Sequence, residues 1–194
     1  MIEKTLWIMC GPPASGKTWF AKNRLQNGPG WIYVSRDEVR FSIIKEDEDY
    51  FSHENEVYVE FLRRIHSALN EEGIFNVIAD ATHLNWSSRN KLISNLSVLE
   101  HGLKNICIIP VVVETDPMVM IQRNDERNGR TKVAHSVIRR MSAQFSDPKN
   151  DPYEYTAIMY VDNGKEKYAD PHKFMYHKND IKMKEIPIKE VLKK

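Results

Sequence analysis

Residues Gly11 to Thr18 (GPPASGKT) form a complete Gly-x-x-x-x-Gly-Lys-Thr pattern, which is typical of a loop that binds phosphate groups. Backbone N–H groups of such a loop surround an anion, and the helix that follows directs its positive end at it. Glycine at both ends of the loop permits a close approach that a Cβ atom would block. The lysine reaches the β- and γ-phosphates, and the threonine hydroxyl is offered to Mg²⁺. We therefore predict that a nucleoside triphosphate is bound by Gly11, Pro12, Pro13, Ala14, Ser15, Gly16, Lys17 and Thr18.

Two charged residues, Asp37 and Arg40, follow the second apolar segment and stand three positions apart. At that spacing they share one face of a helix, next to the expected nucleotide site. A carboxylate there can accept the proton of an acceptor hydroxyl, and a guanidinium can hold an anionic part of the same acceptor. The alternative is structural: an acid in the first turn favours the helix dipole, and Arg40 forms a surface ion pair with it. The sequence leaves both interpretations open.

Asp80 ends the third apolar segment, at the edge of an α/β sheet where ligand sites form. It can hold Mg²⁺ through water, orient the acceptor, or cap a helix or turn. A segment rich in arginine follows the fourth apolar run, with Arg123, Arg127 and Arg130. It predicts a flexible lid that closes over ATP and offsets charge on the γ-phosphoryl group. A solvated charged face is the alternative for this segment, because acidic residues lie between the arginines.

The elements that must position these residues alternate between strands and helices. Strands are expected at 5–10, 31–34, 74–79, 106–113 and 156–161. Helices are expected at 17–26, from Arg36 after a capping box of Ser35 and Glu38, at 53–72, from a cap at Asn85 to Gly102, after Asp116-Pro117, and at 137–145. This alternation predicts the α/β class: a P-loop NTPase-type three-layer fold with a central parallel sheet and helices on both faces.

Composition excludes several classes of protein. The chain has 194 residues, 41% of them hydrophobic and 28% charged, which is enough for one domain with its own core. The longest apolar run, 106–113, is far below the ~18 residues that span a bilayer, and the N-terminus lacks the pattern of a secretory signal. We therefore expect a cytoplasmic protein without a membrane partner. Cys10 and Cys107 lie in apolar runs and are expected to be buried thiols, and no Cys/His cluster has zinc spacing.

Four segments carry a resemblance to a known family: GPPASGKTWFA, GPGWIYVSRDEVRFSI, VIADATHLN and QRNDERNGRTKVAHSVIRRM. In this order, from about residue 5 to about residue 146, they resemble the polynucleotide 5′-hydroxyl kinase family of P-loop proteins. The resemblance implies a kinase that uses ATP and Mg²⁺, in which Lys17 and Thr18 keep their P-loop roles. It further implies that Asp37 is the general base, that Arg40 holds an acceptor phosphate, and that Asp80 is the family's aspartate after the third strand.

The resemblance also assigns the lid. The family's lid arginine corresponds to Arg127, and Arg123 is the first arginine of the motif, which we expect to contact ATP. One extra residue at 128–130 leaves Arg130 as an alternative to Arg127. The chain departs from the family at His83, where asparagine is frequent, and at Ala134, where proline is frequent. No Asp-x-Asp-x-Thr phosphatase signature occurs, so the resemblance implies the kinase activity alone.

The charge distribution divides the chain in two. The formal net charge is +1, which is low for a protein that coats nucleic acid. Residues 164–194 carry nine lysines and five acidic residues, a net +4, so the remainder carries 1 − 4 = −3. We therefore expect a P-loop kinase domain at 1–162 and a basic C-terminal extension at 163–194. Lysines interleaved with aromatic residues suit single-stranded nucleic acid, and a solvated extension with a final short helix is the alternative.

Three functions remain at this stage. The first is transfer of the γ-phosphate of ATP to the 5′-hydroxyl end of DNA or RNA. The second keeps this chemistry but uses a small hydroxylated acceptor, such as a nucleoside, a sugar nucleotide or an antibiotic. The third is an ATP-dependent switch or adaptor without transfer, which would leave the pairing of Asp37 with Arg40 unexplained.

Overall fold

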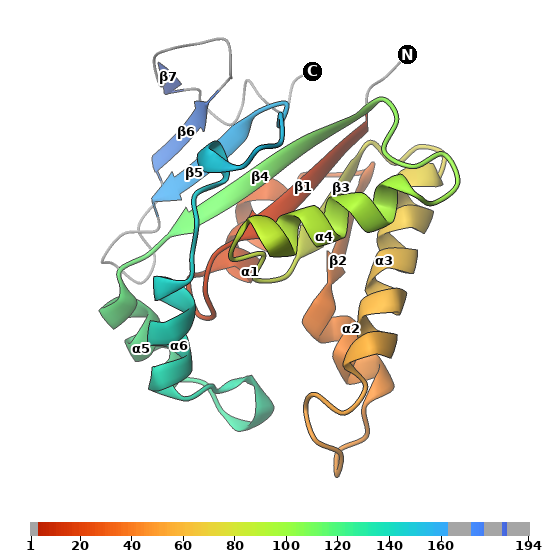
Figure 1. The fold of residues 1–194 in the computed structure, drawn as a ribbon. Helices are drawn as coiled ribbons and strands as arrows, with labels where there is room; N and C mark the ends of the chain where they lie inside the picture. The colour runs from red at the N-terminus through yellow and green to blue at the C-terminus, as the bar shows by residue number, and fades with distance from the viewer. Residues whose placement is uncertain (1–3, 163–171, 177–183, 186–194) are drawn as a thin grey trace.

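The computed structural model describes residues 4–162 and two strand segments beyond them, 172–176 and 184–185. Within these residues the sheet has seven strands in the order β2-β3-β1-β4-β5-β6-β7 (Figure 1). β1 to β5 are parallel, and β6 and β7 extend the sheet antiparallel at the β5 edge. The strands are β1 (Lys4–Cys10), β2 (Trp31–Ser35), β3 (Asn76–Asp80), β4 (Ile106–Glu114), β5 (Ile158–Asp162), β6 (His172–Tyr176) and β7 (Lys184–Glu185).

The helices begin at, or within two residues of, the predicted positions. They are α1 (Lys17–Phe20), which continues as the π-helical turn η1 (Ala21–Leu25), then α2 (Arg36–Ile43), α3 (Glu54–Asn70), α4 (Trp86–Ser97), α5 (Pro117–Asp125) and α6 (His135–Ala143). Two 3-10 turns, η2 (Gly129–Thr131) and η3 (Pro148–Asn150), follow α5 and α6. The predicted strands are present with ends that differ by one or two residues, so the predicted α/β fold with a parallel sheet is confirmed.

Both faces of the sheet are covered, because successive strand residues point to opposite sides. In β1, Leu6 and Ile8 belong to a core that includes the apolar faces of α3 and α4. Trp7 and Met9 belong to a second core, with Phe20 of α1 and the buried residues of η1. The central strand is therefore buried on both sides, which explains its continuous apolar sequence.

The caps of two helices were predicted with different success. Asn85 forms a full capping box with Ser88 at the start of α4. At α2, Ser35 accepts a hydrogen bond from the backbone N–H of Glu38 at 3.3 Å, but the Glu38 carboxylate pairs with Lys22 at 2.6 Å. The predicted capping box of α2 is therefore only half formed, because its acid has a cationic partner on η1.

Three further predictions need correction. The helix expected over 17–26 is α-helical only to Phe20 and then widens to the π-helical η1. α4 ends at Ser97 rather than near Gly102, because the chain continues in turns in which the Gly102 N–H donates to the Leu99 carbonyl. Cys107, expected to be buried, is partly exposed, whereas Cys10 is fully buried.

Three strands end in line at the edge of the sheet that carries the phosphate-binding loop. Asp80, the last residue of β3, is in register with Met9 of β1 and with Ser35 of β2. The loop at 11–16 leaves β1 at this edge, and α2 leaves β2 beside it. Figure 1 shows α2 on one side of this edge and α5 with α6 on the other.

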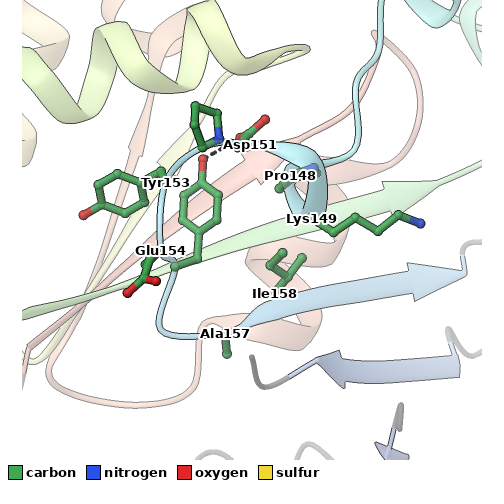
Figure 2. Close-up of a pocket in the computed structure, with 9 residues that line it drawn as sticks. Pro148, Lys149, Asp151, Tyr153, Glu154, Ala157 and Ile158 are labelled. Carbon is green, nitrogen blue, oxygen red and sulfur yellow. Dashed lines mark hydrogen bonds between the residues drawn. The ribbon is translucent and has the colours of Figure 1, made fainter. Parts of the chain in front are cut away.

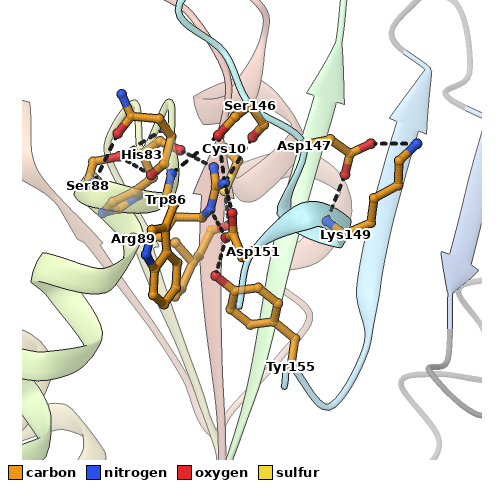
Figure 3. A network of polar contacts seen from close by, with 12 residues as sticks. Cys10, His83, Trp86, Ser88, Arg89, Ser146, Asp147, Lys149, Asp151 and Tyr155 are labelled. Atoms are coloured by element: carbon orange, nitrogen blue, oxygen red, sulfur yellow. Dashed lines mark hydrogen bonds and ion pairs between the residues drawn. The ribbon is translucent and has the colours of Figure 1, made fainter. Parts of the chain in front are cut away.

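A buried ion pair fixes the segment that leads into β5. Arg89 of α4 is fully buried and donates two hydrogen bonds to Asp151, at 2.6 and 2.7 Å (Figure 3). The same guanidinium donates to the carbonyls of His83 at 3.1 Å and Ser146 at 2.9 Å, and the Tyr155 hydroxyl donates to Asp151 at 2.7 Å. These contacts satisfy both buried charges and tie α4 to residues 146–155.

No helix among the described residues combines the length and the apolar character that crossing a bilayer requires.

Candidate functional site

The phosphate-binding loop has the backbone geometry that its glycines permit. Gly11 has a φ of 144° and Gly16 a φ of 95°, conformations that other residues rarely adopt. A Cβ atom on Gly11 would lie 3.0 Å from the Ser15 hydroxyl oxygen and 3.2 Å from the Val113 carbonyl oxygen. The loop therefore has no room for a side chain at its first position.

Lys17, the lysine of the motif, is buried beneath the loop. Its ammonium donates to the Pro12 carbonyl at 2.6 Å and lies 3.4 Å from the Ser15 hydroxyl. Burial lowers the pKa of Lys17, and the carboxylates of Asp80 and Asp37 oppose this shift. The charges of both carboxylates therefore act on the lysine, although Asp80 ends β3 and Asp37 lies in the first turn of α2.

Thr18 and Asp80 form a pair of oxygen groups at the start of α1. The Thr18 hydroxyl donates to Asp80 Oδ2 at 2.7 Å, and the Tyr33 hydroxyl donates to the same oxygen at 2.6 Å. Burial and the negative charge of Asp80 raise the pKa of Tyr33 well above its usual value, so this hydroxyl remains a donor. Hydroxyl and carboxylate oxygens are the ligands that Mg²⁺ prefers, so this pair fits the ion.

Arg40 forms the predicted ion pair with Asp37, but it is buried rather than at the surface. Its guanidinium donates to Asp37 at 2.8 Å, to the Tyr50 hydroxyl at 3.0 Å and to Glu54 at 2.5 Å. The Tyr50 hydroxyl in turn donates to Asp37 Oδ1 at 2.7 Å. The side chain of Asp37 is 68% exposed, so two buried or half-buried groups orient a carboxylate that solvent and substrate can reach.

Arg36, at the start of α2, completes this cluster. It forms an ion pair with Glu54, whose carboxylate therefore lies between two guanidinium groups, and it stacks over the ring of Tyr58. The Nε atoms of Arg36 and Arg40 are both buried, and neither has a hydrogen-bond partner among the described residues.

The three arginines of the lid segment point to different places. Arg123 Nη1 lies 3.4 Å from the Ser15 carbonyl, so it contacts the phosphate-binding loop. Burial lowers the pKa of Arg127 and the Asp37 carboxylate opposes this shift, while Arg127 Nη1 lies 3.4 Å from the Thr131 carbonyl. Arg130 instead donates to backbone carbonyls of the loop between α2 and α3: to Lys45 at 2.9 Å, to Glu48 at 3.0 Å and to Glu46.

This geometry can be compared with known proteins. Residues 6–148, nearly three quarters of the chain, match the AAA_33 family, described as an AAA domain. The chain belongs to this family. It is therefore a P-loop kinase-like domain, and its sheet and helices have the corresponding fold. Among curated proteins, no sequence matches the chain.

Solved structures share this fold at low sequence identity. A chain of the Pnkp1/Rnl/Hen1 RNA repair complex is 22% identical, with a TM-score of 0.61, over 74% of this chain and 44% of that one. A fungal RNA kinase is 11% identical, with a TM-score of 0.57, over 84% of this chain and 39% of the other. The tunicamycin resistance protein of Deinococcus radiodurans is 18% identical, with a TM-score of 0.50, over 79% and 86%. The chain thus spans less than half of the first two structures.

The AAA domain also has a pocket beside the segment that leads into β5. Its volume is about 380 Å³, and Figure 2 shows aromatic and proline side chains around it. It is lined by residues that precede and begin β5, including Tyr153, Tyr155 and Ile158. Asp151, which lines it, pairs with Arg89, and Arg89 in turn donates to the carbonyl of His83, three residues after the end of β3. None of the predicted site residues lines it.

Sequence reasoning missed three polar residues of the AAA domain's site. Tyr33 was predicted only as part of a strand and Glu54 only as part of a helix, and no prediction was made for Tyr50. Their partners lie 47, 13 and 14 positions away, at Asp80, Asp37 and Arg40. No local spacing signals such contacts, although three strands that end in register would have indicated that residues 33 and 80 are close.

Proposed function

We propose that the protein is a kinase that uses ATP and Mg²⁺ to phosphorylate the 5′-hydroxyl end of DNA or RNA. The observation that carries this proposal is the exposed carboxylate of Asp37, held by the buried Arg40 at 2.8 Å on the helix that leaves β2, at the sheet edge that carries the loop of Lys17. Nucleotide binding needs the loop and its lysine. A reachable carboxylate that is oriented by a buried arginine serves a second substrate, which is what a phosphoryl transfer requires.

In the proposed reaction, each residue has one role. Asp37 accepts the proton of the 5′-hydroxyl while the oxygen forms a bond to the γ-phosphorus, and the bond from this phosphorus to the β–γ bridging oxygen breaks to leave ADP. Lys17 and Arg127 offset the negative charge that develops on the phosphoryl oxygens. Arg123 contacts ATP next to the loop, and Arg40 holds the acceptor phosphate beside Asp37.

Thr18 and Asp80 are the residues that would hold Mg²⁺, Thr18 directly and Asp80 through water. When bound, the ion supplies neutralising charge at the phosphate oxygens of ATP. Tyr33 keeps the carboxylate of Asp80 oriented toward Thr18, because it donates to the same oxygen.

The nucleic-acid acceptor is supported by the order of the motifs and by two structural neighbours, an RNA repair complex and a fungal RNA kinase. A second candidate, a small hydroxylated acceptor, is favoured by the net charge of +1 and by the tunicamycin resistance protein, most of whose length this chain covers. We assign residues 1–162 to the kinase domain and 163–194 to a basic extension. Most of that extension lies outside the described residues, apart from the segments of β6 and β7.

A competition experiment separates these acceptors. The protein, Mg²⁺ and γ-labelled ATP are incubated with equimolar amounts of a 5′-hydroxyl oligonucleotide, a nucleoside and a sugar-containing antibiotic, and the labelled products are separated by chromatography. If the proposal is correct, the wild-type protein labels the oligonucleotide, and the Lys17→Ala variant forms no labelled product. Label confined to a small acceptor would favour the second candidate. ATP binding without any labelled product would favour a switch or adaptor.

A further inference from the structure

Three aromatic rings lie next to the candidate base, and the proposed function gives those of Phe41 and Phe51 no role. Phe51 is 65% exposed and Phe41 is 42% exposed, which is unusual for large apolar side chains that gather around one ring. The Tyr50 ring lies between them, with its centroid 4.9 Å from that of Phe51 and 6.0 Å from that of Phe41. We call these three residues the aromatic patch.

The aromatic patch is built onto the candidate acceptor site. The Tyr50 hydroxyl donates to Asp37 at 2.7 Å, so the patch begins one hydrogen bond from the proposed base. The guanidinium of Arg40 lies 4.4 Å from the centroid of the Tyr50 ring and 5.5 Å from that of Phe51. These cation–π contacts hold the two rings in place, although Phe51 is exposed to solvent.

We infer that the aromatic patch binds the base of the acceptor's 5′-terminal nucleotide by stacking, with Phe51 as the main contact. This inference rests on the proposed function. The reacting 5′-hydroxyl and the base belong to the same nucleotide and are joined through one ribose. A base must therefore lie close to Asp37 when the hydroxyl does, and aromatic side chains are the groups on which bases stack irrespective of sequence.

The charges around the patch bear on where the phosphates of the strand lie. The loop that carries Tyr50 and Phe51 also carries Glu46 and Asp47, which are both exposed. These carboxylates repel a phosphate backbone that runs along the loop. The guanidinium of Arg40 packs on the patch from the α2 side, and Lys45 and Arg130 add positive charge at the loop itself. In our inference the base stacks on the patch while the phosphate of its nucleotide lies beside Arg40.

Two oligonucleotides test the inference. They share one sequence and differ only at the 5′ end, where one has a normal nucleotide and the other an abasic ribose with the same 5′-hydroxyl. We expect the wild-type protein to have a roughly tenfold lower KM for the end that has a base, as stacking on one aromatic ring implies. Phe51→Leu should bring the ratio of the two KM values close to one, and Phe51→Trp should retain it.

Phe75→Leu is the matched control. Phe75 is also a partly exposed phenylalanine, but it precedes β3 at the opposite edge of the sheet, so this variant should keep the wild-type ratio. Thermal unfolding of all variants shows whether each is folded. Equal KM values for the two ends in the wild type, or an unchanged ratio in Phe51→Leu, would overturn the stacking inference alone. Absence of transfer to either oligonucleotide would overturn the proposed function and the inference together.

Discussion

Asp37 is the residue on which the proposed transfer depends most, because it is the reachable carboxylate that Arg40 and Tyr50 orient. Asp37→Asn keeps the shape of the side chain but removes the proton acceptor. We expect transfer to slow by ~100-fold or more, with ATP affinity nearly intact. Single-turnover rates and ATP titrations measure both quantities. Glu38→Gln is the control, since Glu38 pairs with Lys22; a rate for Asp37→Asn within a few-fold of wild type would refute the assignment.

Tyr33 is expected to act through Asp80. Tyr33→Phe removes one of the two donors to Asp80 Oδ2 and leaves the Thr18 contact in place. We expect the Mg²⁺ concentration for half-maximal transfer to rise roughly tenfold, because groups that orient a metal ligand have effects of this size. ATP binding without Mg²⁺ should not change. Tyr58→Phe, which removes a hydroxyl bonded to Asn95, should leave the Mg²⁺ titration unaltered, and the same titration for both variants would contradict this role.

The two arginines that the sequence left as alternatives for the lid, Arg127 and Arg130, have different surroundings in the structure. The charge of Asp37 acts on Arg127, whereas Arg130 donates to carbonyls of the loop between α2 and α3. We therefore expect Arg127→Ala to lower kcat by about 100-fold or more, as loss of a group that stabilises developing charge does. Arg130→Ala should act mainly on the KM of the acceptor, since it loosens a contact between two loops. A larger loss of kcat in Arg130→Ala than in Arg127→Ala would reverse the assignment.

The elements themselves were largely predictable, because their signals are local. The Gly-Lys-Thr motif and the apolar run of β4 identify a loop and a buried strand from adjacent residues. The end of α4 was not predictable in this way, because Gly102 closes a later turn instead of the helix. No pattern in the sequence indicates that η1 is π-helical. The capping box of α2 was predicted in full, but the Glu38 carboxylate pairs with Lys22 instead of completing it. Contacts such as Tyr33 with Asp80 depend on strand register, which is a property of the assembled sheet.

At the scale of the whole molecule, His83 makes stability depend on pH. Burial lowers the pKa of His83 from 6.5 to about 4, while its Nδ1 is hydrogen-bonded to the Met9 carbonyl at 2.9 Å. As the pH falls, His83 is therefore protonated near pH 6.5 in the unfolded chain but only near pH 4 in the folded protein. The contribution of His83 to the free energy of unfolding is fully present above pH 6.5. It is lost as the pH falls from 6.5 to 4, and the loss amounts to about 3 kcal/mol.

His83→Asn should remove this pH dependence. Asparagine tolerates the left-handed backbone at this position, where φ is 37°. Urea unfolding at pH 7 and at pH 4 measures the effect, and the wild type should lose about 3 kcal/mol more than the variant between the two pH values. Parallel losses in the two proteins would show that His83 is protonated equally in the folded and unfolded states.

The central claim is that this P-loop domain phosphorylates the 5′ end of a nucleic acid. Its most direct test is label transfer from γ-labelled ATP, with Mg²⁺, to paired strands of one sequence that end in a 5′-hydroxyl or a 5′-phosphate, as DNA and as RNA. We predict label on the 5′-hydroxyl strands alone, and a phosphatase should remove it. The strand that is labelled faster, DNA or RNA, identifies the preferred nucleic acid. No label on any strand, while ATP binding is intact, would contradict the claim.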